Sequence, residues 1–339
     1  MEIATTRKTQ FLVDILDSSQ VGHARRLVLE YATSLSMNEN DCGKIAIAVT
    51  EMATNLIKHA GHGKLLCEEL PLNGASGLRL LSLDNGPGIP NVGAALEDGY
   101  STYGSGGNGL GAVRRLSTVF DLYSAPALGT CIVAEFWPPK PKSTPQSFSF
   151  GVVSLAVRGE ELCGDGWGTR TAPDGSFFMV VDGLGHGAFA AEAAREAERV
   201  LANSNPTSAA SILHDCHDAL KKTRGAAAGV AGISHEKSTL TYAGIGNISA
   251  TVIDHPGRRG MASHNGTLGH QVHKIQEFTM PWTKNSILIM HSDGLATKWD
   301  LNHYPGLTSK HPSIIAAVLY RDFQRQRDDV TVMVAKDDR

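Results

Sequence analysis

Thr50-Glu51-Met52-Ala53-Thr54-Asn55 places a carboxylate and an amide one helical turn apart, and the fold of the first half follows from this stretch. Apolar residues recur at helical spacing between Asp41 and His59, so we predict a helix with Glu51 and Asn55 on one face. An amide oxygen there can bind Mg²⁺, and a carboxylate can accept the proton of an attacking hydroxyl. A Glu/Asn pair taken alone is more often a solvated polar stripe, so the prediction depends on two stretches downstream.

The first of these is Asp84-Asn85-Gly86-Pro87-Gly88-Ile89, which follows the apolar run 78–83. The run predicts a buried strand that delivers Asp84 into a glycine-rich turn, where the backbone can adopt unusual angles or approach a ligand closely. A carboxylate fixed there could accept the exocyclic amine of adenine. In isolation, the segment fits an ordinary Asp-initiated turn equally well.

The second is Gly107-Asn108-Gly109-Leu110-Gly111, which precedes a helix-like stretch over 112–119. Exposed amides of such a loop, added to those at a helix start, suit an anion such as a triphosphate. A flexible loop would have the same composition. The sequence contains no GxxxxGK[ST] motif, so the loop is not a P-loop.

In combination the three stretches resemble the GHKL (Bergerat) ATPase superfamily, and within it the serine kinases of bacterial partner-switching systems that control anti-sigma factors. The resemblance covers about residues 8–137 and implies ATP and Mg²⁺ as cofactors. It implies that Glu51 is the catalytic base and Asn55 the Mg²⁺ ligand. The nucleotide-binding residues it implies are Asn55, Asp84, Gly86, Gly88, Gly107, Gly109, Gly111 and Thr130. The acceptor in this family is a Ser or Thr of a STAS-domain protein.

The second half has four acidic positions, each beside a strand-like run: Asp165, Asp182, Asp293 and Asp328. Strands that terminate in carboxylates can gather hard oxygen ligands at one end of a sheet, which suits Mg²⁺ or Mn²⁺ better than zinc. Two such ions could share a hydroxide poised for attack on phosphorus. Any one Asp-Gly pair would also fit a plain turn, but four acidic positions with matching flanks favour a metal site.

These motifs resemble the PPM (PP2C-like) Ser/Thr phosphatases of the sporulation and stress-response branch, over about residues 148–339. The resemblance implies that Asp182 bridges two metal ions and that the Gly183 carbonyl binds one of them. It implies that Asp293 and Asp328 complete the cluster and that Asp165, the early acidic position, is a further metal ligand. We do not expect His186 to be a metal ligand, because the other candidates are carboxylates. Ala296-Thr297-Lys298 stands where the family often has an acidic residue, which argues against a third metal.

Length and composition agree with two domains in a reducing compartment. The 339 residues exceed the usual size of one core, and the proline-rich stretch 138–147 predicts a linker between an ATPase domain at 1–137 and a phosphatase domain at 148–339. A net charge of -3 gives no support for nucleic-acid binding. Five cysteines without a paired CxxC, and no long apolar run, predict a cytoplasmic protein that does not enter a membrane.

We therefore expect two α/β (α+β) domains: a GHKL α/β sandwich with a helix-backed mixed sheet, then a β-sandwich flanked by helices. The predicted function is a bifunctional regulator that phosphorylates a STAS-domain anti-sigma-factor antagonist with ATP and dephosphorylates a STAS-type partner. An alternative is a nucleotide-dependent module that sequesters a sigma factor or antagonist, while the phosphatase serves a separate partner. A sigma factor or downstream signalling protein is a further expected partner. Formation of a homodimer is implied by the resemblance alone.

Overall fold

The computed structural model describes residues 10–72, 75–97, 109–137, 148–172, 174–254 and 257–337. Contacts group these residues into two units. The N-terminal unit holds the described residues up to 137 together with the segment 300–321, and the C-terminal unit holds 148–299 and 322–337. The expected linker 138–147 lies outside the described residues.

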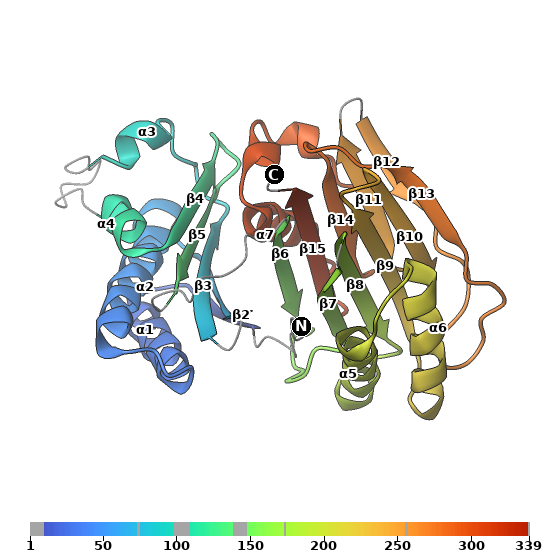
Figure 1. The fold of residues 1–339 in the computed structure, drawn as a ribbon. Coiled ribbons are helices and arrows are strands. Elements are labelled where there is room, and N and C mark those ends of the chain that lie inside the picture. Colours follow the sequence, from blue (N-terminus) through green and yellow to red (C-terminus); the bar gives the residue numbers. More distant parts are fainter. Residues whose placement is uncertain are drawn as a thin grey trace. The chain divides into compact units, whose positions relative to one another are not determined.

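The N-terminal unit is a five-stranded sheet with helices on one face (Figure 1). The strand order is β1-β2-β3-β5-β4. The strands are β1 (Gln10–Ile15), β2 (Gly63–Leu72), β3 (Ala75–Asp84), β4 (Val119–Ser124) and β5 (Thr130–Phe136). The helices are α1 (Ser18–Ser34), α2 (Glu39–Ala60), the short α3 (Val92–Ala95) and α4 (Gly109–Leu116). Apolar side chains of α1, α2 and α4 form one core with the inner face of the sheet.

Helix α2 confirms the helix predicted between Asp41 and His59. Asn38 caps it by accepting a hydrogen bond from the backbone N–H of Asp41 at 2.9 Å. Acidic residues in its first turn and basic residues in its last turn favour the helix dipole. Its buried stripe is Ile45, Ala46, Ala48, Val49, Met52, Ala53 and Leu56. The face that carries Glu51 and Asn55 is left half-buried beside this stripe.

Two expectations for this unit differ from the structure. Every strand pairing described in the sheet is antiparallel, not mixed. Short connections join β2 to β3 and β4 to β5, whereas the β1–β2 and β3–β5 pairings bring together strands that are separated by helices. Helix α4 begins at Gly109 and ends at Leu116, whereas the sequence suggested 112–119. It stops there because the Ser117 hydroxyl donates to the carbonyl of Val113 and the N–H of Thr118 already pairs with Glu135 of β5.

The face of this sheet opposite the helices carries a buried ionic cluster. Arg79 of β3 lies between Glu68 of β2 and Glu135 of β5, its cross-strand neighbours. Its Nη1 is 2.8 Å from Glu68 Oε2, and its Nη2 is 2.7 Å from Glu135 Oε1. All three side chains are buried, and the two carboxylates raise the pKa of Arg79 even though burial alone would lower it. The Arg79 guanidinium therefore compensates the charge of two buried carboxylates in the N-terminal unit.

The segment 300–321 lies against the same unit, although it falls between two strands of the C-terminal unit in the sequence. It contains most of helix α7 (Pro312–Phe323). Lys310 Nζ is 3.1 Å from Asp121 Oδ1, and the N–H of His311 donates to Asp121 Oδ2 at 2.7 Å. At the far end, Arg321 Nη1 donates to the backbone oxygen of Asp84 at 2.7 Å. Residues far apart in sequence thus complete the N-terminal unit.

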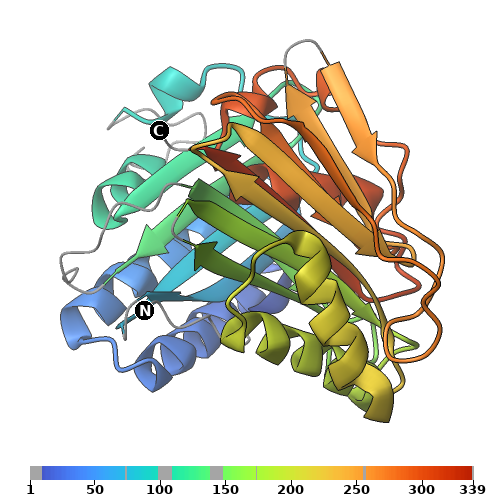
Figure 2. The same cartoon turned by 45° about the vertical axis from the view of Figure 1, so that its right-hand side comes forward.

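The C-terminal unit is a sandwich of two antiparallel five-stranded sheets, ordered β13-β10-β9-β8-β7 and β12-β11-β14-β15-β6. Its strands are β6 (Phe148–Leu155), β7 (Asp165–Ala172), β8 (Gly175–Gly183), β9 (Ala226–Ser234), β10 (Thr239–Ile245), β11 (Ser249–Asp254), β12 (Gly257–Met261), β13 (Glu277–Pro281), β14 (Ile287–His291) and β15 (Val330–Asp337). The sheets enclose one apolar core, and α5 (Ala188–Asn203) and α6 (Ala209–Ala219) cover the outer face of the first sheet (Figure 2). The predicted β-sandwich flanked by helices is confirmed.

Replacing Arg79 by Met should destabilise the N-terminal unit by about 3 to 5 kcal/mol, because Glu68 and Glu135 would be left as unpaired buried acids. Lys64→Met is the matched control, since Lys64 makes a similar contact with Asp14 at an exposed position, worth about 1 kcal/mol or less. Urea unfolding of the full chain would measure both. Equal midpoints for the two variants would contradict this account of the cluster.

Candidate functional site

The first candidate site centres on Glu51 and Asn55 of α2, which face the start of α4. A Cβ built on Gly109 would lie 2.6 Å from Glu51 Oε2 and 4.0 Å from Asn55 Nδ2. The backbone of the first residue of α4 therefore lies directly against the carboxylate and the amide. The structure brings together three residues that are 58 positions apart at most in the sequence (51 to 109). A side chain at position 109 would fill the space beside both polar groups.

Asp84 marks the other part of this site, at the end of β3. Its Oδ1 accepts hydrogen bonds from the N–H of Gly86 at 2.8 Å and of Thr130 at 3.1 Å. Burial raises the pKa of Asp84, while these two N–H donors act in the opposite direction. Thr130 begins β5 opposite Asp84, and its hydroxyl lies 2.9 Å from Ser124 Oγ. Asp84, Gly86 and Thr130 are thus one hydrogen-bonded group, as a shared binding role requires.

Helix α2 links the two parts. A Cβ on Gly86 would lie 2.7 Å from the Cβ of Ala60, the last residue of α2. Glu51 and Ala60 are separated by about 13 Å along the helix axis at 1.5 Å per residue. Gly88 has a φ of +78°, and a Cβ there would meet the Ala125 carbonyl at 2.1 Å, so only glycine fits. The site is an elongated strip along α2 between the turn at 85–88 and the start of α4.

The glycine loop is only partly described. Gly109 and Gly111 lie in α4, where Gly111 is buried. Gly107 lies outside the described residues, so its predicted nucleotide contact stays a prediction.

The second candidate site gathers carboxylates at the ends of strands in the C-terminal unit. Asp165 opens β7 and pairs with Asp182 near the end of β8. Burial and then the repulsion of Asp293 and Asp328 raise the pKa of Asp182 to about 7. The pKa of Asp165 is also raised, first by burial and then by Asp182. All four acidic residues named from the sequence are thus close enough to repel one another through this cluster.

Hydrogen-bond donors hold several of these carboxylates. Ser292 Oγ donates to Asp165 Oδ2 at 2.6 Å, and Asn247 Nδ2 donates to Asp293 Oδ2 at 2.8 Å. Gly183 packs closely on α5, because a Cβ there would lie 2.1 Å from the Ala190 carbonyl oxygen. His186 lies in the exposed loop after Gly183, with Nδ1 2.7 Å from Glu160 Oε1.

Carboxylate and carbonyl oxygens that repel one another in a half-buried position are the donor set that hard divalent cations compensate. Within the described ranges, no three side chains of His, Cys, Asp or Glu converge tightly enough to form a ready-made metal site. The site fits Mg²⁺ or Mn²⁺ because its donors are carboxylate and carbonyl oxygens and because a divalent cation would offset the repulsion between neighbouring carboxylates. Asp165, Asp182, Asp293 and Asp328, with the Gly183 carbonyl, are the residues that could hold such ions.

Sequence reasoning missed Asp329 and the roles of Ser292 and Asn247. Asp329 is buried, and its two oxygens accept from the N–H of Val157 at 2.8 Å and of Gly164 at 2.7 Å. Gly164 precedes Asp165, so Asp329 fixes the backbone that carries a candidate site residue. The Asp-Asp pair at 328–329 was the available signal, since one member can face the site while its neighbour faces the core.

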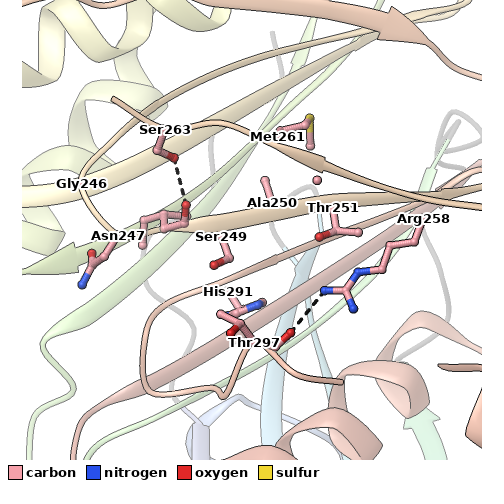
Figure 3. Close-up of a pocket in the computed structure, with 12 residues that line it drawn as sticks. Gly246, Asn247, Ser249, Ala250, Thr251, Arg258, Met261, Ser263, His291 and Thr297 are labelled. Carbon is pink, nitrogen blue, oxygen red and sulfur yellow. Dashed lines mark hydrogen bonds between the residues drawn. The ribbon is translucent and has the colours of Figure 1, made fainter. Parts of the chain in front are cut away.

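A cavity of about 340 Å³ lies beside this cluster (Figure 3). Asn247, which holds Asp293, lines one end, and Arg258 lines the other. His291 lies in the lining with its ring fully engaged: Nδ1–H donates to the Ser292 carbonyl at 2.8 Å, and Nε2 accepts from Trp299 Nε1 at 3.3 Å. Burial lowers the pKa of His291, which favours this neutral form. Both ring nitrogens of His291 are thus held by hydrogen bonds, two residues before Asp293.

Comparisons with known proteins agree with this geometry. Residues 16–136 match the histidine kinase-like ATPase domain family, and residues 172–337 match the stage II sporulation protein E (SpoIIE) family. The serine/threonine-protein kinase RsbT of Bacillus subtilis (strain 168) is 37% identical over 128 residues, covering 38% of this chain and 96% of RsbT. The phosphoserine phosphatase RsbX of the same organism is 29% identical over 145 residues, covering 42% of this chain and 73% of RsbX.

Among solved structures, one described as "The bacterial stressosome: a modular system that has been adapted to control secondary messenger signaling" is 26% identical with a TM-score of 0.53. The match covers 56% of this chain and 100% of the matched chain in that structure. The two units thus have a GHKL-like ATPase fold and a PP2C-type phosphatase fold, as the sequence predicted. The chain belongs to the histidine kinase-like ATPase family through its N-terminal part and carries a SpoIIE-type phosphatase domain after it.

Replacing Asp329 by Asn should lower the free energy of unfolding by about 1 to 3 kcal/mol, because the amide group cannot accept from both N–H donors. The matched control is Asp218→Asn at an exposed position on α6, which should change it by about 0.5 kcal/mol or less. Urea unfolding with EDTA present would measure both without a contribution from bound cations. An Asp329 variant as stable as the control would contradict the positioning role.

Proposed function

We propose that this chain is a bifunctional partner-switching regulator that phosphorylates a Ser or Thr of a STAS-domain anti-sigma-factor antagonist with ATP and removes phosphate from a phosphorylated STAS-type partner. The observation that carries this proposal is the presence of two separate polar sites in one chain. One is a carboxylate and amide against a helix start, and the other is a cluster of strand-end carboxylates. The first suits phosphoryl transfer from a nucleotide, and the second suits metal-assisted hydrolysis.

In the kinase site, Glu51 would accept the proton of the attacking hydroxyl, and Asn55 would hold Mg²⁺ through its amide oxygen. Asp84 would accept the exocyclic amine of adenine, because its orientation is fixed by the N–H groups of Gly86 and Thr130. The helix start at Gly109 would present free N–H groups to phosphate oxygens. ATP and Mg²⁺ would supply the phosphoryl group and its charge neutralisation. The similarity to RsbT over nearly its whole length supports these assignments.

In the phosphatase site, Asp182 would lie between two cations, and Asp293, Asp328 and the Gly183 carbonyl would complete their protein ligands. Asp165 would be a further ligand, with a carboxylate that Ser292 orients. Two Mg²⁺ or Mn²⁺ ions would supply a hydroxide for attack on phosphorus. Asn247 would orient Asp293, since it donates directly to Oδ2. The match to the SpoIIE family and to RsbX supports this reading.

The names of the relatives support a protein partner. RsbT is a protein kinase and RsbX is a phosphoserine phosphatase, so opposed activities in one chain would set the phosphorylation level of a protein. A STAS-domain antagonist is the partner we propose, with a sigma factor further downstream. Among the described residues, no helix is long and apolar enough to span a membrane. We propose that the protein acts in the cytoplasm.

The alternative function is a nucleotide-dependent binding module, in which the N-terminal unit sequesters a sigma factor or antagonist and the phosphatase serves a separate partner. The placement of Glu51 favours the kinase. A carboxylate directly beside the start of α4 is where a base is needed, while binding alone has no use for it.

Glu51→Gln should keep ATP binding but slow phosphoryl transfer by a factor of about 100 to 10,000, because the amide is nearly isosteric yet cannot accept a proton. Glu39→Gln at the exposed start of the same helix is the control and should transfer at the wild-type rate. Single-turnover transfer to a STAS-domain protein and calorimetry with Mg-ATP separate the two steps. Wild-type transfer by Glu51→Gln would favour the binding-module alternative.

Asp182→Asn should abolish Mn²⁺-dependent hydrolysis of p-nitrophenyl phosphate while leaving kinase transfer unchanged. Asp182 interacts with both Asp293 and Asp328, so removing its charge weakens the attraction of the cluster for two cations at once. Asp218→Asn on α6 removes a carboxylate at an exposed position away from the cluster and should be fully active. Circular dichroism would confirm that both variants fold. Full turnover by Asp182→Asn would overturn the metal assignment.

A further inference from the structure

Exposed apolar side chains gather beside the carboxylate cluster. Among the described residues, the large apolar side chains that are exposed are Leu16, Ile47, Leu162, Leu184 and Phe189. Leu184 is 55% exposed and Phe189 is 60% exposed, and they stand on either side of the turn that follows the candidate ligand Gly183. Leu162 lies three residues before Asp165. Exposed apolar groups that cluster in this way mark interaction surfaces more often than scattered ones do.

Contacts within the C-terminal unit join these residues into one surface. The N–H of Leu184 donates to the Gly225 carbonyl at 3.0 Å, which sets the 183–189 turn against the residue next to Arg224. The Arg224 guanidinium carbon lies 4.8 Å from the centroid of the Phe189 ring. Leu162 lies two residues after Glu160, whose carboxylate contacts His186 of the same turn. We call Leu162, Leu184, Phe189 and Arg224 the site rim.

The chemistry of the proposed phosphatase requires that something cover the site rim. In a phosphoserine, only Cβ and one ester oxygen separate Cα from phosphorus. A substrate whose phosphate reaches the carboxylates must therefore bring its own backbone down onto the surface around them. Leu184 follows Gly183 directly, and Phe189 stands at the start of α5, so both lie where that backbone would arrive.

The charge of the site rim adds a second feature. Arg224 stacks on the face of Phe189 and, within the part of the chain that the structure describes, forms no ion pair. Stacking leaves the in-plane N–H groups of a guanidinium free to donate to a carboxylate. A ring and a guanidinium held together in this way are typical of residues that dominate the binding energy of protein interfaces.

We propose that the site rim docks the phosphorylated substrate protein, with an apolar side chain near the phosphoserine packed on Leu184 and Phe189 and an acidic side chain paired with Arg224. This rests on the proposed phosphatase function. It assigns selection of the protein substrate to residues that do not touch the reacting atoms. A small phosphate ester needs only the carboxylates, whereas a phosphoprotein needs the rim as well.

Phe189→Ser tests this with two substrates. Against a serine-phosphorylated STAS-domain protein, kcat/KM should fall about 10- to 100-fold, mainly through KM, as for loss of one dominant interface residue. Turnover of p-nitrophenyl phosphate with Mn²⁺ should stay within about twofold of wild type, since the carboxylates are untouched. The matched control is Ile47→Ser, an exposed apolar residue of the N-terminal unit, which should change neither rate. Thermal unfolding would confirm that both variants fold.

Arg224 gives an independent arm of the test. Arg224→Glu should raise KM for the phosphoprotein at least as much as Phe189→Ser does. Arg224→Lys should raise this KM less than Arg224→Glu at low salt, because the positive charge is kept. Equal losses on both substrates, or no loss on the phosphoprotein, would overturn the docking role. If Phe189→Ser instead converts a wild-type dimer into monomers with unchanged phosphoprotein turnover, the rim binds a second copy and the proposal is wrong. A wild-type chain that hydrolyses neither substrate refutes the phosphatase function itself.

Discussion

Repulsion between carboxylates is the constraint on which the C-terminal unit is built. Asp165, Asp182, Asp293 and Asp328 come from separate strand ends, and burial, followed by repulsion from neighbouring carboxylates, raises the pKa values of Asp165, Asp182 and Asp328. The fold opposes this repulsion with fixed donors, namely the Ser292 hydroxyl and the Asn247 amide. The close-packed cluster of apolar and aromatic side chains between the two sheets supplies the rigidity that keeps the strand ends from moving apart. Stability elsewhere thus maintains a local arrangement that is unfavourable without a cation.

The N-terminal unit handles charge differently. Its buried acids, Glu68 and Glu135, are neutralised by Arg79 on the face of the sheet away from the helices. Glu51, the proposed catalytic base, stays half-buried on a helix and faces the backbone of Gly109 instead of another carboxylate. The N-terminal unit therefore holds its buried ion pairs on one face of the sheet and the proposed catalytic Glu51 on the other side. In the C-terminal unit the buried Asp329, which accepts two backbone N–H bonds, directly follows the proposed metal ligand Asp328.

Sequence periodicity predicted helix α2 and strand β3 well, because one side of each is buried in a continuous core and the other is not. It could not predict that Asp329 would bind two backbone N–H groups, since that depends on segments more than 160 residues away (329 to 164 and 157). The antiparallel order of the first sheet also escaped it, because strand pairing is a non-local property. The candidate residues came from motif spacing, and the structure groups most of them, but their chemical roles and the domain boundaries stay predictions.

The path of the segment 300–321 makes the N-terminal unit discontinuous in sequence. The chain leaves the C-terminal unit after Trp299, contributes contacts to Asp121 and Asp84 of the other unit, and re-enters at Asp322. A single cut in the proline-rich stretch would consequently not release either unit whole. Expressing the first 137 residues alone would remove the partners of Asp121 and of the Asp84 carbonyl. Gene fission or domain exchange at that stretch would leave residues 300–321, which belong to the N-terminal unit, on the C-terminal fragment. This favours inheritance of the two halves as one polypeptide.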